Sequence, residues 1–276
     1  MIDSHTHTKY SKHATGNVED LVKAAIDKNI KILTITDHAP FYIDTNNRLL
    51  ISELKRYSEE IDHAKDKYSG SIRILKGLEA DFLPNNLDNL SAIISDIELD
   101  YLIGSIHYIF VGDKRINVWD IESISHPAVI SQYFVCMKEL LESGLFDAVG
   151  HPDAILRGGI PDSLYYEHFD PLITLMKKND ISYELNASGS SKTTYDLLTK
   201  VHMCDICSYP SWPTVAALNA NGVSFTIGSD AHAPEKVGNG IDRVLQELQS
   251  LGLTSISYYE KRKRIDVALH CSRLLL

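Results

Sequence analysis

Short β-rich runs alternate with amphipathic helical stretches from one end of this 276-residue chain to the other. Such alternation is typical of βα units that build a parallel sheet. Seven runs have strand character, at residues 1–5, 32–36, 72–80, 100–107, 147–151, 181–186 and 223–229. Helical patterns occupy residues 17–29, 51–68, 127–143, 163–179, 213–221 and, at the C-terminus, 252–270. With no linker, repeat or low-complexity tract, the sequence predicts one α/β domain over residues 1–276.

Each predicted strand ends in, or is followed by, a side chain that can bind metal or phosphate. These side chains are His5 and His7, Asp37 and His38, Glu79, His107, His151, Asn186 and Ser188, and Asp230 and His232. In a barrel of parallel strands the carboxyl ends meet around one mouth. We therefore expect these residues to converge. The alternative, a set of separate solvated loop residues, requires several independent coincidences.

Composition excludes several classes of protein. The 27 basic and 37 acidic residues leave a formal charge of −10, which argues against a broad surface for nucleic acid or acidic lipid. No apolar run approaches the roughly 20 residues that span a bilayer, and no basic segment followed by an apolar one begins the chain. We expect a cytoplasmic protein with no nucleic-acid partner and no membrane contact.

The cysteines and several histidines carry no predicted function. Four cysteines are too few and too scattered for a disulfide framework. Cys204 and Cys207 form a C-x-x-C without the second pair of a zinc ribbon, so we expect reduced thiols. We expect solvated side chains for the histidines in helical or loop contexts, namely His63, His126, His168, His202 and His270.

A family resemblance is carried by eight stretches that cover nearly the whole chain. In order, they are HTH, SKH, TDHAP, GLEADF, SIH, GHPDAILR, ELNASG and GSDAHAPEKVG. In these stretches the chain resembles the PHP-family metallophosphoesterases, and most of all the histidinol-phosphate phosphatases of that family. The resemblance implies a distorted (β/α)7 barrel that holds three metal ions, which agrees with the seven strands counted above.

The same resemblance implies a division of the ligands among three metals. One metal is expected on His5, His7, Glu79 and Asp230. A second is expected on Glu79 as a bridge together with His107 and His151, and a third on His13, His38 and His232. Nitrogen-rich sites with a few carboxylates suit zinc, iron or manganese better than magnesium or calcium. The sequence does not choose among the three.

Such a centre is expected to hydrolyse a phosphate monoester by attack of a metal-bridging hydroxide. Arg157 follows His151 by six residues and is expected to grip the phosphoryl group; as an alternative, it is a surface arginine. Asp37 is expected either to orient an imidazole or to cap its turn.

Further substrate contacts are expected from the loop after the sixth strand. They involve Asn186, Ser188 and Lys192. Many family members have SGLRK where this chain has SGSSK. The usual arginine is missing, and Lys192 is expected to supply part of its charge.

The expected small-molecule substrate is L-histidinol phosphate, which yields L-histidinol and phosphate. Its amine and imidazole call for acidic or aromatic partners, and Phe41, Tyr42, Asp44 and Tyr209 lie in candidate rim loops. Two alternatives stay open: a PHP phosphoesterase that acts on nucleotides, and a catalytically silent, metal-stabilised scaffold. Nine filled ligand positions weigh against the scaffold. The oligomeric state is left open.

Overall fold

The seven strands that the alternation predicts form one parallel sheet. The computed structural model describes residues 1–120, 124–203, 209–270 and 273–274. The strand order is β1-β2-β3-β4-β7-β8-β11, with every neighbouring pair parallel. The strands are β1 (Ile2–Asp3), β2 (Ile32–Ile35), β3 (Arg73–Asp81), β4 (Tyr101–Ser105), β7 (Ala148–Val149), β8 (Ser182–Asn186) and β11 (Phe225–Gly228). The predicted α/β barrel is confirmed.

The first and last strands of the sheet lie side by side and nearly close the barrel. The Ser4 N–H donates to the Ile227 carbonyl at 2.9 Å, and the Asp230 N–H donates to the His5 carbonyl at 2.8 Å. A Cβ on Gly228 would lie 2.3 Å from the Cβ of His5, so only glycine permits this approach. Buried Asp3 strengthens the closure, because its carboxylate accepts hydrogen bonds from the backbone and hydroxyl of Ser229.

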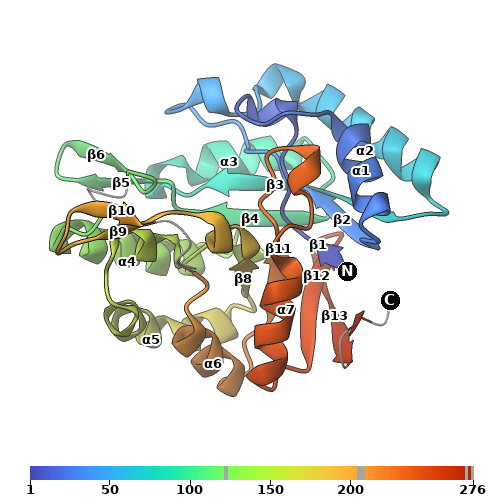
Figure 1. The fold of residues 1–276 in the computed structure, drawn as a ribbon. Helices are drawn as coiled ribbons and strands as arrows, with labels where there is room; N and C mark the ends of the chain where they lie inside the picture. The colour runs from blue at the N-terminus through green and yellow to red at the C-terminus, as the bar shows by residue number, and fades with distance from the viewer. Residues whose placement is uncertain (121–123, 204–208, 271–272, 275–276) are drawn as a thin grey trace.

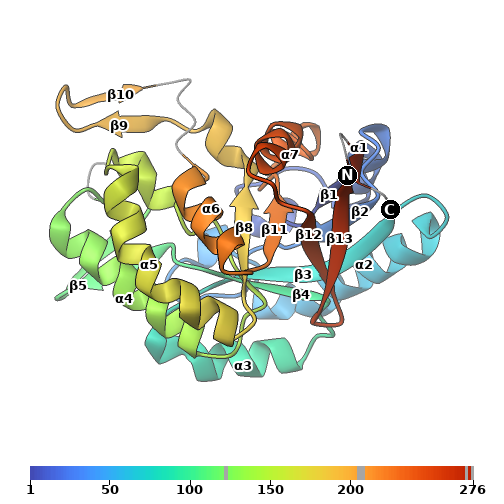
Figure 2. The same ribbon diagram turned by 90° about the horizontal axis from the view of Figure 1, so that it is seen from below.

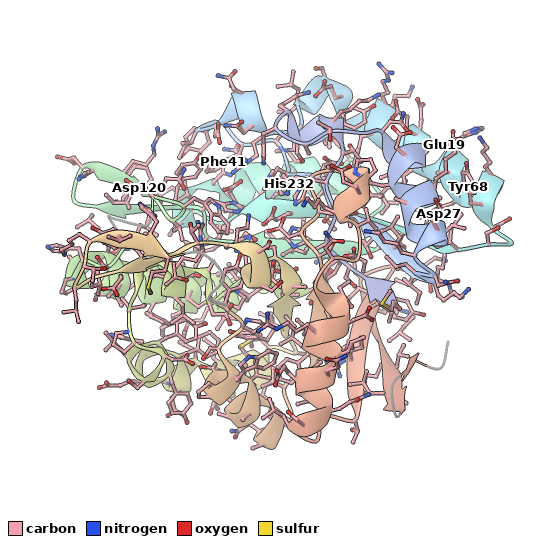
Figure 3. All side chains as sticks on the ribbon, in the orientation of Figure 1. Glu19, Asp27, Phe41, Tyr68, Asp120 and His232 are labelled. Atoms are coloured by element: carbon pink, nitrogen blue, oxygen red, sulfur yellow. The ribbon has the colours of Figure 1, made fainter. Side chains whose placement is uncertain are left out.

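Helices surround the barrel (Figures 1 and 2). They are α1 (Val18–Asp27), α2 (Leu54–Tyr68), α3 (Leu87–Ser95), α4 (Pro127–Glu142), α5 (Asp162–Lys178), α6 (Trp212–Ala220) and α7 (Ile241–Ser250). Five of them confirm the predicted helices, whereas α3 and α7 were not predicted. Asn17 and Asp20 form a reciprocal capping box at the start of α1. Glu19 of α1 accepts a hydrogen bond from Tyr68 of α2 at 2.8 Å (Figure 3).

The predicted helix over residues 252–270 is wrong. This segment forms an antiparallel hairpin of β12 (Ser255–Glu260) and β13 (Lys263–His270), and β13 also pairs with β14 (Arg273–Leu274). Lys261 and Arg262 form the two-residue turn with φ of 52° and 60°, as a type I′ hairpin turn requires. The β-branched and aromatic residues on both sides of the basic run favour strands.

This C-terminal hairpin covers the amino-terminal end of the barrel. The Tyr259 ring stacks on Tyr101 of β4 at 5.2 Å between centroids. Its hydroxyl donates to the Asp147 carbonyl at 2.9 Å and lies 2.8 Å from Ser182 Oγ. The Arg262 guanidinium bonds the Asp147 carboxylate at 2.5 Å. Because Asp147 and Ser182 stand where β7 and β8 begin, the hairpin closes the end opposite the predicted site.

Two smaller hairpins extend from the barrel. One pairs β5 (Tyr108–Val111) with β6 (Lys114–Asn117), and the other pairs β9 (Thr194–Asp196) with β10 (Val201–Met203). The second projects from the body of the protein (Figure 2). Among the residues described, no helix is long and apolar enough to cross a membrane.

Removing the Tyr259 side chain should destabilise the fold. A large buried aromatic replaced by alanine costs roughly 3–5 kcal/mol of unfolding free energy, whereas Tyr259→Phe removes only hydrogen bonds, at about 1 kcal/mol. Urea unfolding followed by circular dichroism measures both changes. The control is Tyr42→Ala, because Tyr42 is 63% exposed. Equal unfolding midpoints for Tyr259→Ala and the control would contradict a structural role for the hairpin.

Candidate metal centre

The carboxyl ends of the strands bring the predicted ligands around one cavity. His5, His7, Glu79, His107 and His151 are at most 3% exposed, and the Asp230 side chain is 6% exposed. The cavity has a volume of about 670 Å³. Its lining includes His13, His38, Glu79, His107, His151, Asp230 and His232. The expected convergence at one mouth of the barrel is therefore confirmed.

Glu79 lies at the centre of this group and has a different set of imidazoles on each oxygen. Its Oε1 is 2.8 Å from His151 Nε2 and 3.4 Å from His107 Nε2, and those two nitrogens are 3.3 Å apart. Its Oε2 is 3.4 Å from His5 Nε2 and 3.5 Å from His7 Nε2. Glu79 is thus placed to bridge two neighbouring groups of ligands.

The second group joins His5 and His7 to Asp230. The two Nε2 atoms are 3.0 Å apart, and Asp230 Oδ1 lies 3.3 Å from His7 Nε2 and 3.8 Å from His5 Nε2. Asp230 has a φ of 51°, and His151 in the first group has a φ of 31°. Non-glycine residues in this region are strained, and such strain is concentrated at functional sites.

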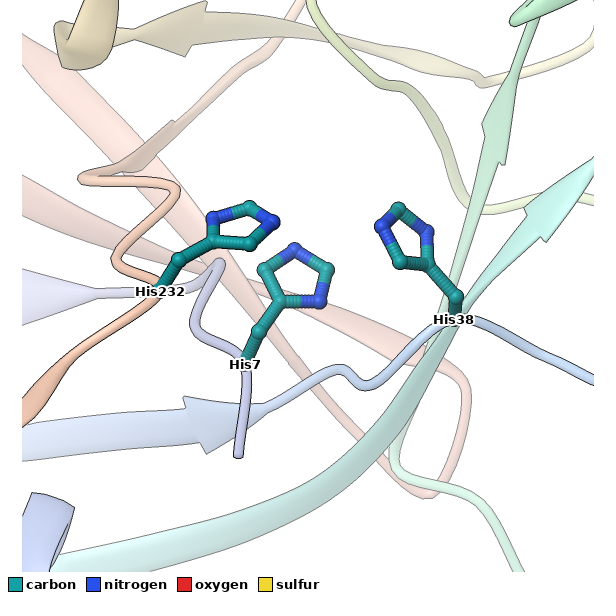
Figure 4. Close-up of side chains that lie close together, drawn as sticks. All are labelled: His7, His38 and His232. Carbon is teal, nitrogen blue, oxygen red and sulfur yellow. The ribbon is translucent and has the colours of Figure 1, made fainter. Parts of the chain in front are cut away.

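The third group lies at the open side of the cavity. Ligand atoms of His7, His38 and His232 come within 4.8 Å of one another (Figure 4). His13 is exposed, and its ring centroid is 4.7 Å from that of His232 and 5.2 Å from that of His38. All nine expected ligands therefore meet in one place. Because His7 and His38 can each belong to more than one group, their division among three metals stays a prediction.

Burial and mutual charge set the protonation of these groups. Burial by itself raises the pKa of Glu79, but His38, His5 and His107 outweigh it and hold this pKa well below its usual value. Burial lowers the pKa of His107, but Asp81 and Glu79 raise it to about 9. For His5, the carboxylates of Glu184, Glu79 and Asp230 outweigh burial and raise the pKa well above its usual value. Burial and neighbouring histidines lower the pKa of His7 to about 3, and burial holds the pKa of His38 well below its usual value. Without metal, His5 and His107 therefore carry the protons that face the buried carboxylates.

The arrangement fits metal cations. His38 Nδ1 lies 2.7 Å from Glu79 Oε2, yet neither atom has a hydrogen-bond partner among the described residues. The Nε2 atoms of His5 and His7 face each other at 3.0 Å and can share at most one proton. Buried polar atoms without partners are costly. Cations between these nitrogens and carboxylate oxygens would satisfy them, and this mixture of ligands suits zinc and its transition-metal neighbours.

Glu184 orients two of the ligands and was missed by the sequence analysis. It is 1% exposed on β8, and its Oε1 lies 2.5 Å from His5 Nδ1. Its Oε2 accepts from the His151 backbone N–H at 2.6 Å. Carboxylates behind metal-bound imidazoles fix the ring orientation and raise its basicity. The available signal was its place in ELNASG, where it points to the same side of the strand as Asn186.

Asp81 and Arg48 form a second supporting pair that the sequence analysis missed. Asp81 Oδ1 lies 2.8 Å from His107 Nδ1. Nε and Nη2 of Arg48, a residue only 4% exposed, donate to the two Asp81 oxygens at 2.7 and 3.1 Å. Asp81 lies two residues after Glu79 in GLEADF, so a pattern of alternate residues along β3 could have identified it.

Asp37 caps a turn and reaches a ligand only through another residue. Its carboxylate accepts four hydrogen bonds, from the backbone and hydroxyl groups of Thr8 and Ser11, at 2.6–3.0 Å. The Ser11 hydroxyl is in turn 3.1 Å from His7 Nδ1. Asp37 therefore has the turn-capping contacts of the alternative interpretation and also fixes the hydroxyl beside His7. It does not line the cavity.

Arg157 lies beside the cavity and contacts it through Trp119. The Arg157 guanidinium is 5.2 Å from the centroid of the Trp119 ring, and Lys192 Nζ is 5.4 Å from the same centroid. Trp119 and Lys192 line the cavity. Arg157 Nε donates to the Thr193 carbonyl at 3.1 Å. Trp119 follows β6 in a segment with no sequence signal, so its role as a shared platform could not be predicted.

The two polar residues of the β8 loop lie at different depths. Asn186 is fully buried and donates to Glu184 Oε2 at 3.1 Å, so it supports the ligands from behind. Ser188 lines the cavity, and its hydroxyl donates to Asn186 Oδ1 at 2.7 Å. The cavity is also lined by Lys236 and Asn239 of the loop before α7, which the sequence analysis did not name.

The residues without a predicted function lie elsewhere. His63, His126 and His202 are exposed, whereas His168 stacks on Phe134 at 4.9 Å between centroids rather than being free in solvent. The side chain of His270, and Cys204 and Cys207, lie outside the described residues. Cys136 is buried and free.

Comparison with known proteins finds relatives that align with nearly the whole chain. The chain is 28% identical over 268 residues to a probable histidinol-phosphatase of Deinococcus radiodurans, and this match covers 95% of the chain and 98% of that protein. A probable histidinol-phosphatase of Schizosaccharomyces pombe is 24% identical, with 94% and 90% covered.

A solved structure has the same fold. It is a histidinol phosphate phosphatase from Lactococcus lactis, in complex with zinc, L-histidinol and phosphate. It superimposes with a TM-score of 0.78 at 18% identity and covers 96% of this chain and 98% of its own. The family model described as the PHP domain matches residues 3–188, about two thirds of the sequence. The chain belongs to the PHP domain family.

Proposed function

We propose that this protein is a metal-dependent phosphatase that hydrolyses L-histidinol phosphate to L-histidinol and phosphate. The observation that carries the proposal is the convergence of nine ligand candidates from the ends of six strands around one cavity of about 670 Å³, which seven of them line. The relatives named histidinol-phosphatases, which align over nearly their full length, support this substrate. The cytoplasmic location and the lack of a nucleic-acid partner stay predictions.

The proposed cofactors are three divalent transition metals. His5, His7, Glu79 and Asp230 would hold one of them. The second would be held by Glu79, His107 and His151, and the third by His13, His38 and His232. When bound, such ions ionise a water molecule near neutral pH and stabilise the charge on phosphoryl oxygens.

The remaining residues of the site orient the ligands and the substrate. Glu184 and Asp81 keep the imidazoles of His5 and His107 in one orientation through their Nδ1 atoms. Lys192 lies on the cavity wall, and the Arg157 guanidinium lies over the ring of Trp119, which lines the same cavity. The two cations would bind the phosphoryl oxygens, a charge-assisted contact for which the planar guanidinium is best suited. Ser188 would add a neutral hydroxyl donor.

Metal content tests the proposed centre. Elemental analysis of protein purified without chelator should find about three transition-metal ions per chain, because the ligands form three overlapping groups. His151→Ala should lower this number by about one, and the control His63→Ala, on an exposed histidine of α2, should not. Active protein with one ion or fewer per chain would rule out a trinuclear centre.

A substrate panel tests the proposed reaction. Among common phosphate monoesters, histidinol phosphate should have the highest kcat/KM, measured by phosphate release. The panel includes nucleoside monophosphates, nucleoside bisphosphates and sugar phosphates. A nucleotide with the higher kcat/KM would favour the alternative PHP activity and leave the metal chemistry intact. No turnover of any ester by fully metallated protein would favour the scaffold interpretation.

Arg157→Ala should damage catalysis without removing metal. A hydrogen bond to a charged group contributes roughly 1.5–3 kcal/mol, and about 1.4 kcal/mol corresponds to tenfold in rate, so kcat/KM should fall at least about tenfold. Arg157→Lys should restore part of the loss, because lysine keeps the charge but lacks the planar guanidinium that can donate two parallel hydrogen bonds. Steady-state kinetics and metal analysis measure both effects. Arg56→Ala is the control, because this side chain is 71% exposed. An unchanged kcat/KM would make Arg157 a support for Trp119 only.

A further inference from the structure

A smaller recess adjoins the metal cavity on the side of the β5–β6 hairpin. It has a volume of about 210 Å³ and shares His13, His38, His107 and Trp119 with the larger cavity. Its own walls come from the loop after β2 and from the hairpin. The recess therefore has about a third of the volume of the metal cavity, and a small polar group fits into it. A group linked to a phosphate at the metals can therefore enter it.

Asp44 is held in a fixed position in this recess. The Tyr108 hydroxyl donates to Asp44 Oδ2 at 2.7 Å, and Asn47 Nδ2 donates to Oδ1 at 2.8 Å. Tyr108 is itself packed in a small apolar cluster with Phe41 and Leu83. An ionised carboxylate has about four acceptor positions, and these two bonds leave further positions on each oxygen. The recess thus contains an oriented anion that can accept from a ligand.

The cations around Asp44 leave its carboxylate without a direct charged partner at hydrogen-bond distance among the described residues. The nearest cation is Arg48, whose Nη1 is 3.6 Å from Asp44 Oδ2. Arg48 makes its two direct bonds to Asp81, so two carboxylates share one guanidinium. Arg115 lies over the Tyr108 ring at 5.4 Å but is exposed, so solvent screens it. A positively charged ligand group could make the short, direct contact with Asp44 that Arg48 does not make.

We propose that this recess binds a protonated amine on the alcohol part of the substrate and that Asp44 determines this specificity. The inference rests on the proposed function, because it places the phosphate of the same ester at the metals. It assigns the enzyme to monoesters of cationic amino alcohols and disfavours esters of neutral or acidic alcohols. Trp119 forms the wall that both subsites share, with the cations Arg157 and Lys192 on the phosphate side and Asp44 in the recess.

The test compares two substrates in fully metallated protein. For the wild type and Asp44→Asn, kcat/KM is measured with histidinol phosphate and with glycerol phosphate, whose alcohol is neutral. The kcat/KM for histidinol phosphate divided by the kcat/KM for glycerol phosphate should fall at least tenfold in Asp44→Asn. The matched control is Asp113→Asn, because Asp113 is an exposed aspartate in the turn of the β5–β6 hairpin, and its ratio should equal that of the wild type.

Competitive inhibition by L-histidinol gives a second measurement, which does not depend on turnover of histidinol phosphate. Its inhibition constant against glycerol phosphate should rise at least fivefold in Asp44→Asn. Tyr108→Phe, which removes one hydrogen bond from Asp44, should change the ratio in the same direction by a smaller factor. This variant keeps the test decisive if Asp44→Asn does not fold.

The possible failures are distinguishable. A wild-type enzyme without preference for histidinol phosphate over glycerol phosphate would overturn the proposed function and this inference with it. A wild-type preference that Asp44→Asn and Tyr108→Phe leave unchanged would overturn only the inference. An equal loss with both substrates in Asp44→Asn would do the same, because it would assign Asp44 to support of the metal site through Arg48.

Discussion

The site is built on attraction between buried carboxylates and buried imidazoles. Glu79, Glu184 and the side chain of Asp230 are at most 6% exposed, and burial of an isolated carboxylate is very costly. Each is compensated by neighbouring imidazoles or backbone N–H groups, and the imidazoles need the carboxylates for the same reason. At the mouth of the barrel, the buried carboxylates therefore depend on the imidazoles for compensation of their charge, and the imidazoles depend on the carboxylates. Metal ions would supply the remaining positive charge, so the fold of the barrel mouth and metal binding are thermodynamically coupled.

This coupling explains why the two carboxylates that hold ligand imidazoles, Glu184 and Asp81, lie on strands rather than on loops. Glu184 on β8 and Asp81 at the end of β3 hold His5 and His107 through their Nδ1 atoms. Strand backbones are fixed by hydrogen bonds on both sides, so each imidazole is positioned by a rigid partner. Of the residues expected to contact substrate, Arg157, Ser188 and Lys192 lie on segments that follow strands, whereas Asn186 is the buried last residue of β8. Rigid support behind the metals and variable loops in front of them is the arrangement by which one barrel serves several substrates.

Local patterns in the sequence predicted the seven strands, five helices and the convergence of the ligands, because strand ends in a parallel barrel have only one place to meet. They did not predict the C-terminal hairpin, because its turn residues Lys261 and Arg262 are good helix formers and lack the Asn or Gly that marks a type I′ turn in a sequence. Arg48 and Trp119 were missed for a different reason. Each acts through a neighbour distant in sequence, Arg48 through Asp81 and Trp119 through Arg157 and Lys192, and no spacing along the chain records such contacts.

The closure of the barrel makes the segments after its first and last strands parts of the same site. His5 and His7 follow the first strand, whereas Asp230 and His232 follow the last, and the backbone bond from Asp230 to His5 joins them. The family model ends at residue 188, before two of the nine expected ligands. Residues after 188 therefore line the same cavity as the ligand candidates that lie within the family model. Gly228 is needed at this junction, because a Cβ there would clash with the Cβ of His5. A side chain would therefore push His5 away from Asp230.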